Sequence, residues 1–279
     1  MVKTELTTKL KAYLLYLKQS EKSISTCKQY CRDIEHFLIW LGNKQLIKDK
    51  VILYKDMLIK EYRPASVNTK LAAVNGFLDF LGAPECRVKQ LKIQRQAYCS
   101  SEKELTKQEY IRMLRLAKTQ GNERLVLLLQ TVCSTGIRVS ELQYITAEAV
   151  RAGEAVVRLK GKTRTILIAG KLRKVLKSYM RRNQFWTGPI FVTKNGKPLD
   201  RSNIWRMLKE LGRKAGVKET KVFPHNLRHL FARCFYAIDK DIAKLADILG
   251  HSSIDTTRIY ILSSGREHRE RMEKLGLVI

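Results

Sequence analysis

The sequence has little cysteine and proline, and no long apolar run. Its 279 residues include 6 Cys and 5 Pro, with no C-x-x-C pair and no Cys and His set at zinc spacing. Scattered thiols are typical of a reduced intracellular protein and argue against a disulfide scaffold or a zinc site. No stretch of about 18 apolar residues occurs, which argues against export or a membrane span. We therefore expect a cytoplasmic protein with no cofactor.

Acidic residues are scarce beside basic ones. The chain has 54 Lys and Arg against 26 Asp and Glu, a formal net charge of +28. Such an excess attracts polyanions and makes nucleic acid the leading partner class, although a generally basic surface is the alternative that charge alone leaves open. The 44% hydrophobic content indicates a folded protein, and the length suffices for two domains. No acidic cluster suited to two magnesium ions lies beside the motifs described below.

The first third of the chain has helical periodicity throughout. A short helix is expected over 51–59, and Pro64 separates it from a fourth helix that ends at Gly82. The residues expected on buried faces of the first, second and fourth helices are Leu6, Leu10, Tyr13, Leu14 and Leu17; Ile24, Cys27, Cys31, Ile34, Leu38 and Leu41; and Val67, Leu71, Val74, Leu78 and Leu81. Together these helices predict a small four-helix domain.

The apolar period is lost between Ala83 and Glu104, where basic residues are frequent. We place the interdomain linker in this stretch. The predicted boundaries are a helical domain over 1–98, a linker over 99–104 and a second domain over 105–279, with a tail from about 263. A solvated connector and a basic clamp around a duplex both fit this stretch.

The second domain is predicted to be mainly α-helical with a small antiparallel β-sheet. It opens with a capping box, Thr106-Lys107-Gln108-Glu109. Two β-rich runs, 156–160 and 165–168, predict a hairpin with lysines at its tip, and 190–192 is a candidate third strand. Helices are expected at 202–215, 225–237, 242–249, in a short segment reaching Tyr260, and from about 264 to 275.

Three motifs carry the residue types for phosphodiester chemistry. Residues 135–142 read Thr-Gly-Ile-Arg-Val-Ser-Glu-Leu, residues 224–229 read Pro-His-Asn-Leu-Arg-His, and residues 249–253 read Leu-Gly-His-Ser-Ser, with Tyr260 nine residues after His251. The planar, permanently charged arginine side chain suits the nonbridging oxygens of a phosphate. Histidine exchanges protons near neutral pH, and a tyrosine that loses its proton can attack phosphorus.

These motifs resemble those of the tyrosine recombinases, the phage-integrase and Xer-type family. The residues that carry the resemblance, in the family's order, are Arg138, His225, Arg228, His251 and Tyr260. The helical first third is similar to the family's SAM-like core-binding domain. The resemblance implies a C-shaped clamp on double-stranded recombination sites and a homotetramer, and hence a protein associated with the nucleoid. It also implies strand cleavage and rejoining through a 3'-phosphotyrosyl intermediate without metal or ATP.

The resemblance also implies a role for each residue. Tyr260 would be the nucleophile, His225 would exchange its proton, and His251 would donate a hydrogen bond to the phosphate, which Arg138 and Arg228 would neutralise.

The family has a lysine in this hairpin that protonates the departing 5'-oxygen, and two residues of this chain, Lys160 and Lys162, are candidates for it. We favour Lys160 over Lys162 because it precedes Gly161 as the family's lysine precedes a glycine.

Four further residues receive weaker assignments. Glu141, three residues after Arg138, could orient that arginine, although a surface glutamate is the simpler account. His229 is expected to point elsewhere on its helix and to be structural. His36 and His268 receive no role.

The tail, Ser263–Ile279, ends in five residues of which four are apolar and which need burial. Docking into a neighbouring protomer, as the family implies, and docking on its own domain both remain open.

Two other functions are considered. A noncatalytic DNA-binding or architectural protein could keep the fold and the charge, and a type IB topoisomerase would use similar chemistry. The intact motif set argues against the first, and the helical first third with its Leu-Gly-His-x8-Tyr spacing argues against the second. Integration or excision of a mobile element, chromosome-dimer resolution, the target sequence and any directionality factor stay open.

Overall fold

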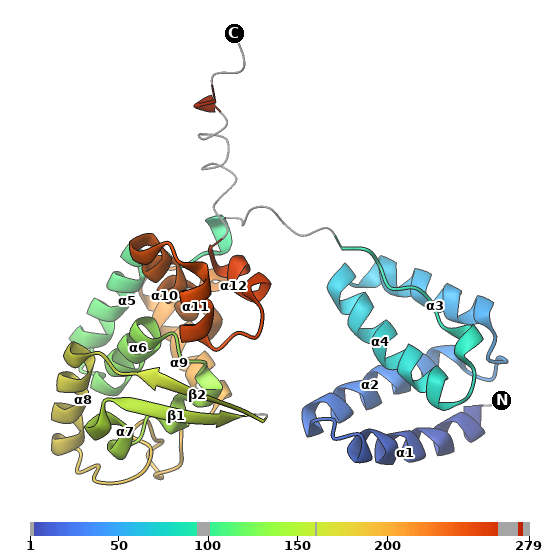
Figure 1. Cartoon of the computed structure of the whole chain (residues 1–279), viewed down its shortest axis with the longest axis horizontal. Coiled ribbons are helices and arrows are strands. Elements are labelled where there is room, and N and C mark those ends of the chain that lie inside the picture. Colours follow the sequence, from blue (N-terminus) through green and yellow to red (C-terminus); the bar gives the residue numbers. More distant parts are fainter. Residues whose placement is uncertain (1–2, 94–100, 160, 262–272, 276–279) are drawn as a thin grey trace. The chain divides into compact units, whose positions relative to one another are not determined.

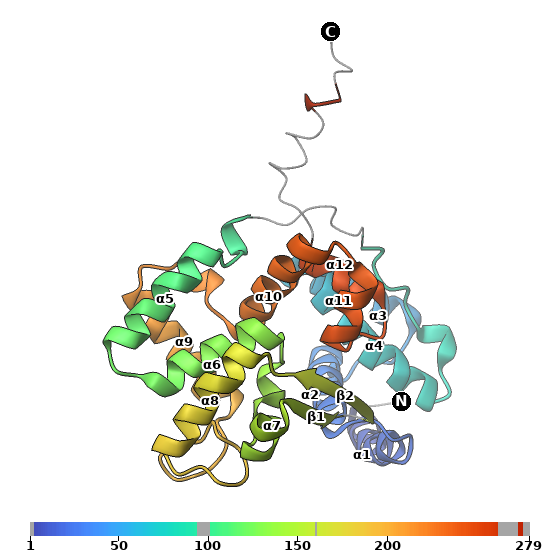
Figure 2. The same cartoon turned by 60° about the vertical axis from the view of Figure 1, so that its left-hand side comes forward.

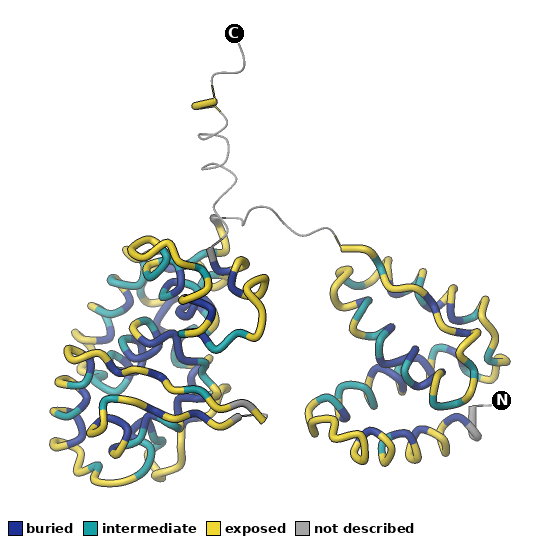
Figure 3. The backbone as a smooth tube through the Cα atoms, viewed as in Figure 1, coloured by how far each residue is buried: buried dark blue, intermediate teal, exposed yellow. Residues whose placement is uncertain are grey.

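The computed structural model describes residues 3–93, 101–159, 161–261 and 273–275 (Figure 1). The chain divides into two compact units, Met1–Arg95 and Gln96–Ile279. No helix in the described ranges is long and apolar enough to cross a membrane. Each unit buries its own apolar residues, which form the dark interior segments of Figure 3.

The first unit is the four-helix domain that the sequence predicts. Its helices are α1 (Lys3–Gln19), α2 (Ile24–Leu41), α3 (Lys48–Glu61) and α4 (Pro64–Phe80). Pro64 begins α4, where its missing N–H would have no helical partner anyway. The assignment of Ile24 to the buried face is wrong, because this residue lies in the first turn of α2 beside the N-cap Ser23 and is 76% exposed.

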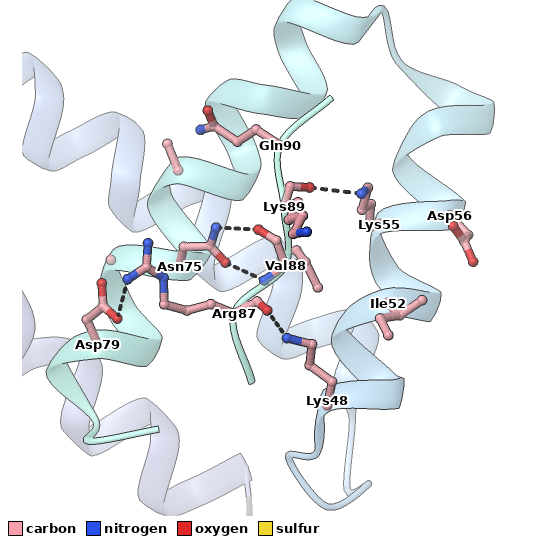
Figure 4. A pocket seen from close by; sticks show the side chains of 12 residues that line it. Lys48, Ile52, Lys55, Asp56, Asn75, Asp79, Arg87, Val88, Lys89 and Gln90 are labelled. Atoms are coloured by element: carbon pink, nitrogen blue, oxygen red, sulfur yellow. Dashed lines mark hydrogen bonds and ion pairs between the residues drawn. The ribbon is translucent and has the colours of Figure 1, made fainter. Parts of the chain in front are cut away.

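The segment that follows α4 is held on this unit by side-chain amides. The Asn75 amide donates to the Val88 carbonyl at 2.8 Å and accepts from the Val88 N–H at 3.1 Å. Asn68, one heptad earlier on α4, pairs with Leu91 in the same way at 2.9 and 2.8 Å. Polar side chains therefore fix a segment without an apolar period. Figure 4 shows part of this segment, 87–90, beside a pocket of about 940 Å³. Two lysines of α3 donate to backbone carbonyls of the segment, Lys48 to Arg87 and Lys55 to Lys89.

The second unit is mostly helical. Its α-helices in the described ranges are α5 (Lys107–Thr119), α6 (Glu123–Thr135), α7 (Ala147–Ala152), α8 (Gly170–Arg182), α9 (Arg201–Lys214), α10 (Pro224–Asp239), α11 (Ile242–Leu249) and α12 (Ile254–Ile261). Helix α6 packs against α5, α8 and α10, and α10 packs against α11 and α12, which lie together in both views (Figures 1 and 2). The predicted capping box is confirmed, since Thr106 and Glu109 exchange hydrogen bonds of 2.8 and 3.1 Å at the start of α5.

The described residues form one two-stranded sheet. Strands β1 (Glu154–Leu159) and β2 (Lys162–Leu167) are antiparallel, with Val156 opposite Thr165. Strand β2 therefore begins three residues earlier than the sequence pattern indicates.

The prediction of a third strand at 190–192 is wrong, because these described residues belong to no strand of the sheet. The segment 189–198 forms only isolated bridges, between Thr146 and Pro189 and between Val192 and Pro198. Proline has no N–H to continue a ladder, which explains why the pairing stops there. The expected last helix, 264–275, lies outside the described residues except for 273–275.

Candidate active site

Arg138 follows a turn made by a glycine, Gly136. Helix α6 ends at Thr135 and is capped by Gly136, whose φ of +62° lies in the left-handed region. A Cβ on Gly136 would stand 2.5 Å from Phe231 and 2.9 Å from Leu249, so the close approach of α10 and α11 also requires glycine here. The chain then turns into a 3₁₀ helix, Val139–Tyr144, directly after Arg138.

Glu141 is buried, and the surface interpretation of this residue is wrong. Only 2% of it is exposed. Its Oε1 accepts from Arg138 Nη1 at 3.0 Å, and its Oε2 accepts from the Arg138 backbone N–H at 2.9 Å and from Arg164 Nη2 at 2.5 Å. Burial acts to raise the pKa of Glu141, but the hydrogen bonds from Arg164 and Arg138 outweigh it and hold the pKa below its ordinary value. Glu141 is thus a carboxylate that orients Arg138.

Arg228 lies in the interior, with 1% of the residue exposed. Its Nη1 donates to the Gly136 carbonyl at 2.5 Å, and its Nη2 donates to the Leu249 carbonyl at 2.7 Å. Its Nε has no partner among the described residues. Burial, with a smaller effect from the charge of Arg138, lowers the pKa of Arg228 to about 10, which leaves the side chain charged at neutral pH.

His251 follows Gly250, the left-handed C-cap of α11. Its Nε2 lies 2.9 Å from Arg228 Nη2, and its Nδ1 lies 2.9 Å from Thr257 Oγ1. Because a guanidinium only donates, Nε2 must accept and Nδ1 carries the proton. Burial and the charge of Arg228 lower the pKa of His251 to about 4, which is consistent with the neutral ring. In this arrangement Nε2 accepts from Arg228, whereas the expected bond to phosphate would require it to donate.

Tyr260 and His225 are in direct contact. The Tyr260 hydroxyl lies 3.2 Å from His225 Nε2, and 5% of Tyr260 is exposed. His225 is exposed at the surface, but neighbouring groups shield part of its ring from water. This loss of water, followed by the charges of Arg228 and Arg138, lowers the pKa of His225. A neutral imidazole in contact with a phenol can accept its proton.

His229 belongs to the site, so the expectation that it points elsewhere is wrong. Its ring stacks on Tyr260, with centroids 4.1 Å apart, and meets His225 edge-on at 4.8 Å. His225 and His229 are four residues apart on α10, a spacing that puts both rings on one helical face and could have identified His229.

Two pockets adjoin Arg138, whose side chain is 37% exposed. The first, of about 490 Å³, is also lined by His225 and Arg228 and by two residues that the motifs did not indicate, Arg201 and Trp205 on α9. The second, of about 670 Å³, is lined by residues that include Glu141, Thr163, Arg164, Gly250 and His251. A phosphodiester at Arg138 would thus have open space on both sides of that side chain.

The structure brings together five of the six residues in the predicted catalytic set: Arg138, His225, Arg228, His251 and Tyr260. Lys160 lies outside the described residues, as does the side chain of its competitor Lys162. The described residues contain no group of three or more His, Cys, Asp or Glu arranged to hold a metal ion. A phenol beside a base, with two guanidinium groups close by, can carry out nucleophilic attack on a phosphodiester.

Comparisons with known proteins agree in both units. The family model for the phage integrase family matches residues 103–266, and the model for the phage integrase N-terminal SAM-like domain matches 10–83. Tyrosine recombinase XerA of Pyrococcus furiosus is 31% identical over 96% of this chain and 94% of its own length. The TnP I resolvase of Bacillus thuringiensis is 26% identical over 95% and 99%.

Solved structures show the same fold. A crystal structure of XerA recombinase aligns with a TM-score of 0.54 at 28% identity, covering 96% of this chain and 98% of that one. Lambda integrase (residues 75–356) bound to DNA aligns with a TM-score of 0.74 at 18% identity, with the same coverages.

Proposed function

Because the chain belongs to the phage integrase family and is a tyrosine-type site-specific DNA recombinase, we propose that Tyr260 cleaves DNA through a 3'-phosphotyrosyl intermediate. The observation that carries this proposal is the 3.2 Å contact between the Tyr260 hydroxyl and His225 Nε2. In the cleavage step the phenol proton passes to His225 as the phenolic oxygen bonds to phosphorus. The bond from phosphorus to the 5'-oxygen breaks, and that oxygen takes a proton to leave as a 5'-hydroxyl.

The two arginines would stabilise the five-coordinate phosphorus. Arg138 is partly exposed and borders both pockets, so it supplies direct contact with a nonbridging oxygen. Arg228 adds a fixed positive charge from the protein interior. Its contacts to Gly136, Leu249 and His251 use three of its five N–H groups, so its Nε–H and one Nη1–H remain to donate to the phosphate. Charge that develops in the transition state then meets donors held in place before the reaction.

The hairpin lysine would supply the proton for the departing 5'-oxygen. Lys160 is proposed for this role, with Lys162 as its competitor. Substituting each lysine in turn and supplying a 5'-thiolate leaving group, which needs no protonation, would identify the acid. Rescue of the Lys160→Ala variant but not of Lys162→Ala supports the assignment.

The assembly would be a homotetramer on two double-stranded recombination sites, with the segment from about 263 docking on the neighbouring protomer and a directionality factor as a further partner. Its role would be either integration and excision of a mobile element or chromosome-dimer resolution. Lambda integrase has been solved as a tetramer bound to a Holliday junction, which supports the assembly by likeness of fold.

A nicked suicide duplex tests the chemistry. The wild-type protein should give a covalent protein–DNA band on its own site, and Tyr260→Phe should abolish that band while still shifting the DNA in a gel. Tyr236→Phe, a change on neighbouring α10, is the matched control and should keep the band. A wild-type protein that binds its site but forms no covalent band would instead support the noncatalytic DNA-binding function.

A further inference from the structure

Arg164 is a largely buried arginine that the proposed chemistry does not use. It lies on β2, and its side chain is 13% exposed. Its Nη2 donates to Glu141 Oε2 at 2.5 Å, and its Nη1 donates to the Ile248 carbonyl in the last turn of α11 at 2.9 Å. One guanidinium thus joins the hairpin to two segments that are distant in sequence.

Glu141 connects Arg164 to Arg138. One carboxylate oxygen holds the Arg138 side chain and the other is shared by the Arg138 backbone and Arg164. The carboxylate cannot rotate without breaking one of these contacts. Removing Arg164 would free one oxygen of a buried carboxylate and remove a cation from its immediate surroundings, so the direction of the Arg138 side chain would be less well determined.

The stem of Arg164 also supports the turn that carries His251. A Cβ on Gly250 would stand 2.4 Å from Arg164 Cδ, so this glycine and the arginine stem are in close contact. The Arg138 Nη2 faces the carbonyl of the same glycine at 3.5 Å. The hairpin, Arg138 and the start of the His251 turn therefore meet at Arg164.

We propose that Arg164 is a positioning residue for strand cleavage, which fixes Arg138 through Glu141 and fixes the Gly250–His251 turn through Ile248. This inference rests on the proposed cleavage by Tyr260. Arg164 itself does not contact the DNA in this role. Its effect should therefore appear in the rate of cleavage at saturating DNA and should require the charge on the phosphate that Arg138 neutralises.

The test compares Arg164→Met with Arg138→Ala in single-turnover cleavage of a suicide duplex. We expect Arg164→Met to lower the rate constant at saturation by about 10- to 100-fold, the range that small misplacements of reacting groups produce, with less than about a threefold change in DNA affinity. Arg164→Lys, which keeps the charge and can make one of the two contacts, should fall between Arg164→Met and wild type. Arg181→Met, an exposed arginine on α8, should behave as wild type.

A methylphosphonate at the scissile position separates positioning from folding. This linkage lacks one anionic oxygen, so both Arg138→Ala and Arg164→Met should lose most of their defect relative to wild type on the same substrate. Because the two changes share the route to Arg138, Glu141→Gln combined with Arg164→Met should slow cleavage by less than the product of the two separate fold-changes, and the Ile248 contact accounts for any further loss. A defect of equal size on both substrates, or additive effects of the two changes, would overturn the inference. Absence of a covalent band from the wild-type protein would instead reject the proposed function.

Discussion

The imidazole of His229 stacks on the phenol ring of Tyr260, with centroids 4.1 Å apart and planes inclined by 23°. The same imidazole meets the His225 ring edge-on, so both the proposed nucleophile and its proposed base contact the His229 ring. Burial, followed by the proximity of His225 and the charges of Arg233 and Arg228, lowers the pKa of His229 to about 3, so the ring is uncharged at neutral pH. The imidazole of His229 therefore covers one face of the Tyr260 ring.

Replacing His229 tests this packing. We expect His229→Ala to slow single-turnover cleavage by about tenfold, because an aromatic pair contributes about 1 kcal/mol beyond burial and its loss frees the Tyr260 ring. His229→Phe keeps a flat ring and should stay within about threefold of wild type. Equal losses in the two variants would show that the imidazole acts through its nitrogens.

The pH dependence of cleavage follows from His225. The pKa of His225 is lowered, so the neutral form that accepts a proton persists below pH 6.5, the ordinary value for histidine. The acidic inflection in the rate of single-turnover cleavage should therefore lie below pH 6.5, so that more than half of the His225-dependent rate is kept at that pH. His225→Gln should be slow and should lose that acidic inflection. An inflection of the wild-type profile above pH 7 that disappears in His225→Gln would contradict this role.

Stability should also depend on pH through His229. Its folded pKa of about 3 lies below the unfolded value near 6.5, so between these limits the unfolded chain binds more protons and acid favours unfolding. The free energy of unfolding should be largest above pH 6.5 and fall as the pH drops, by up to about 1.4 kcal/mol per pH unit from this group. Urea unfolding at pH 7 and pH 5 should show a smaller loss for His229→Phe than for wild type. An equal loss in both proteins would mean that His229 does not supply it.

Gly136 offers a test of the turn before Arg138. Gly136→Ala should lower the free energy of unfolding by about 2–4 kcal/mol, because a left-handed backbone strain and a clash with Phe231 and Leu249 act together. Gly121→Ala is the matched control, with a φ of +68° and no atom within 4 Å of its Cβ position, and should show the strain alone. Urea unfolding measures both, and similar losses would show that the site relaxes around the added methyl group.

The order of the motif residues could be read from the sequence, whereas several of their contacts could not. Short spacings such as His225 to Arg228 lie on one helix, and helical geometry relates them directly. The sequence favours a surface position for Glu141, whereas its burial depends on Arg164, which comes from a hairpin 23 residues later. The sequence predicts a phosphate ligand at Arg228, but the burial of this side chain depends on the Gly136 and Leu249 carbonyls, which come from two other segments.

Helix α8 shows a similar limit in the fold. It was not predicted, because its buried residues Leu172, Leu176, Tyr179 and Met180 stand among six basic residues. The narrow apolar face of such a helix is recognised only when the neighbouring elements that cover it are known. For α8 these elements are α6 and α7.

Tyr260 shares an apolar cluster with Ala232, Leu245 and Leu249, and this restricts how the chain can change over evolutionary time. A substitution of Tyr260 by a small residue leaves a cavity among these side chains as well as removing the hydroxyl, so the protein loses both the proposed nucleophile and the packing of α10, α11 and α12. Phenylalanine removes only the oxygen. Among substitutions at position 260, phenylalanine therefore lets a lineage lose the proposed catalysis while it keeps a folded DNA-binding protein, and a phenylalanine at this position would mark such a descendant.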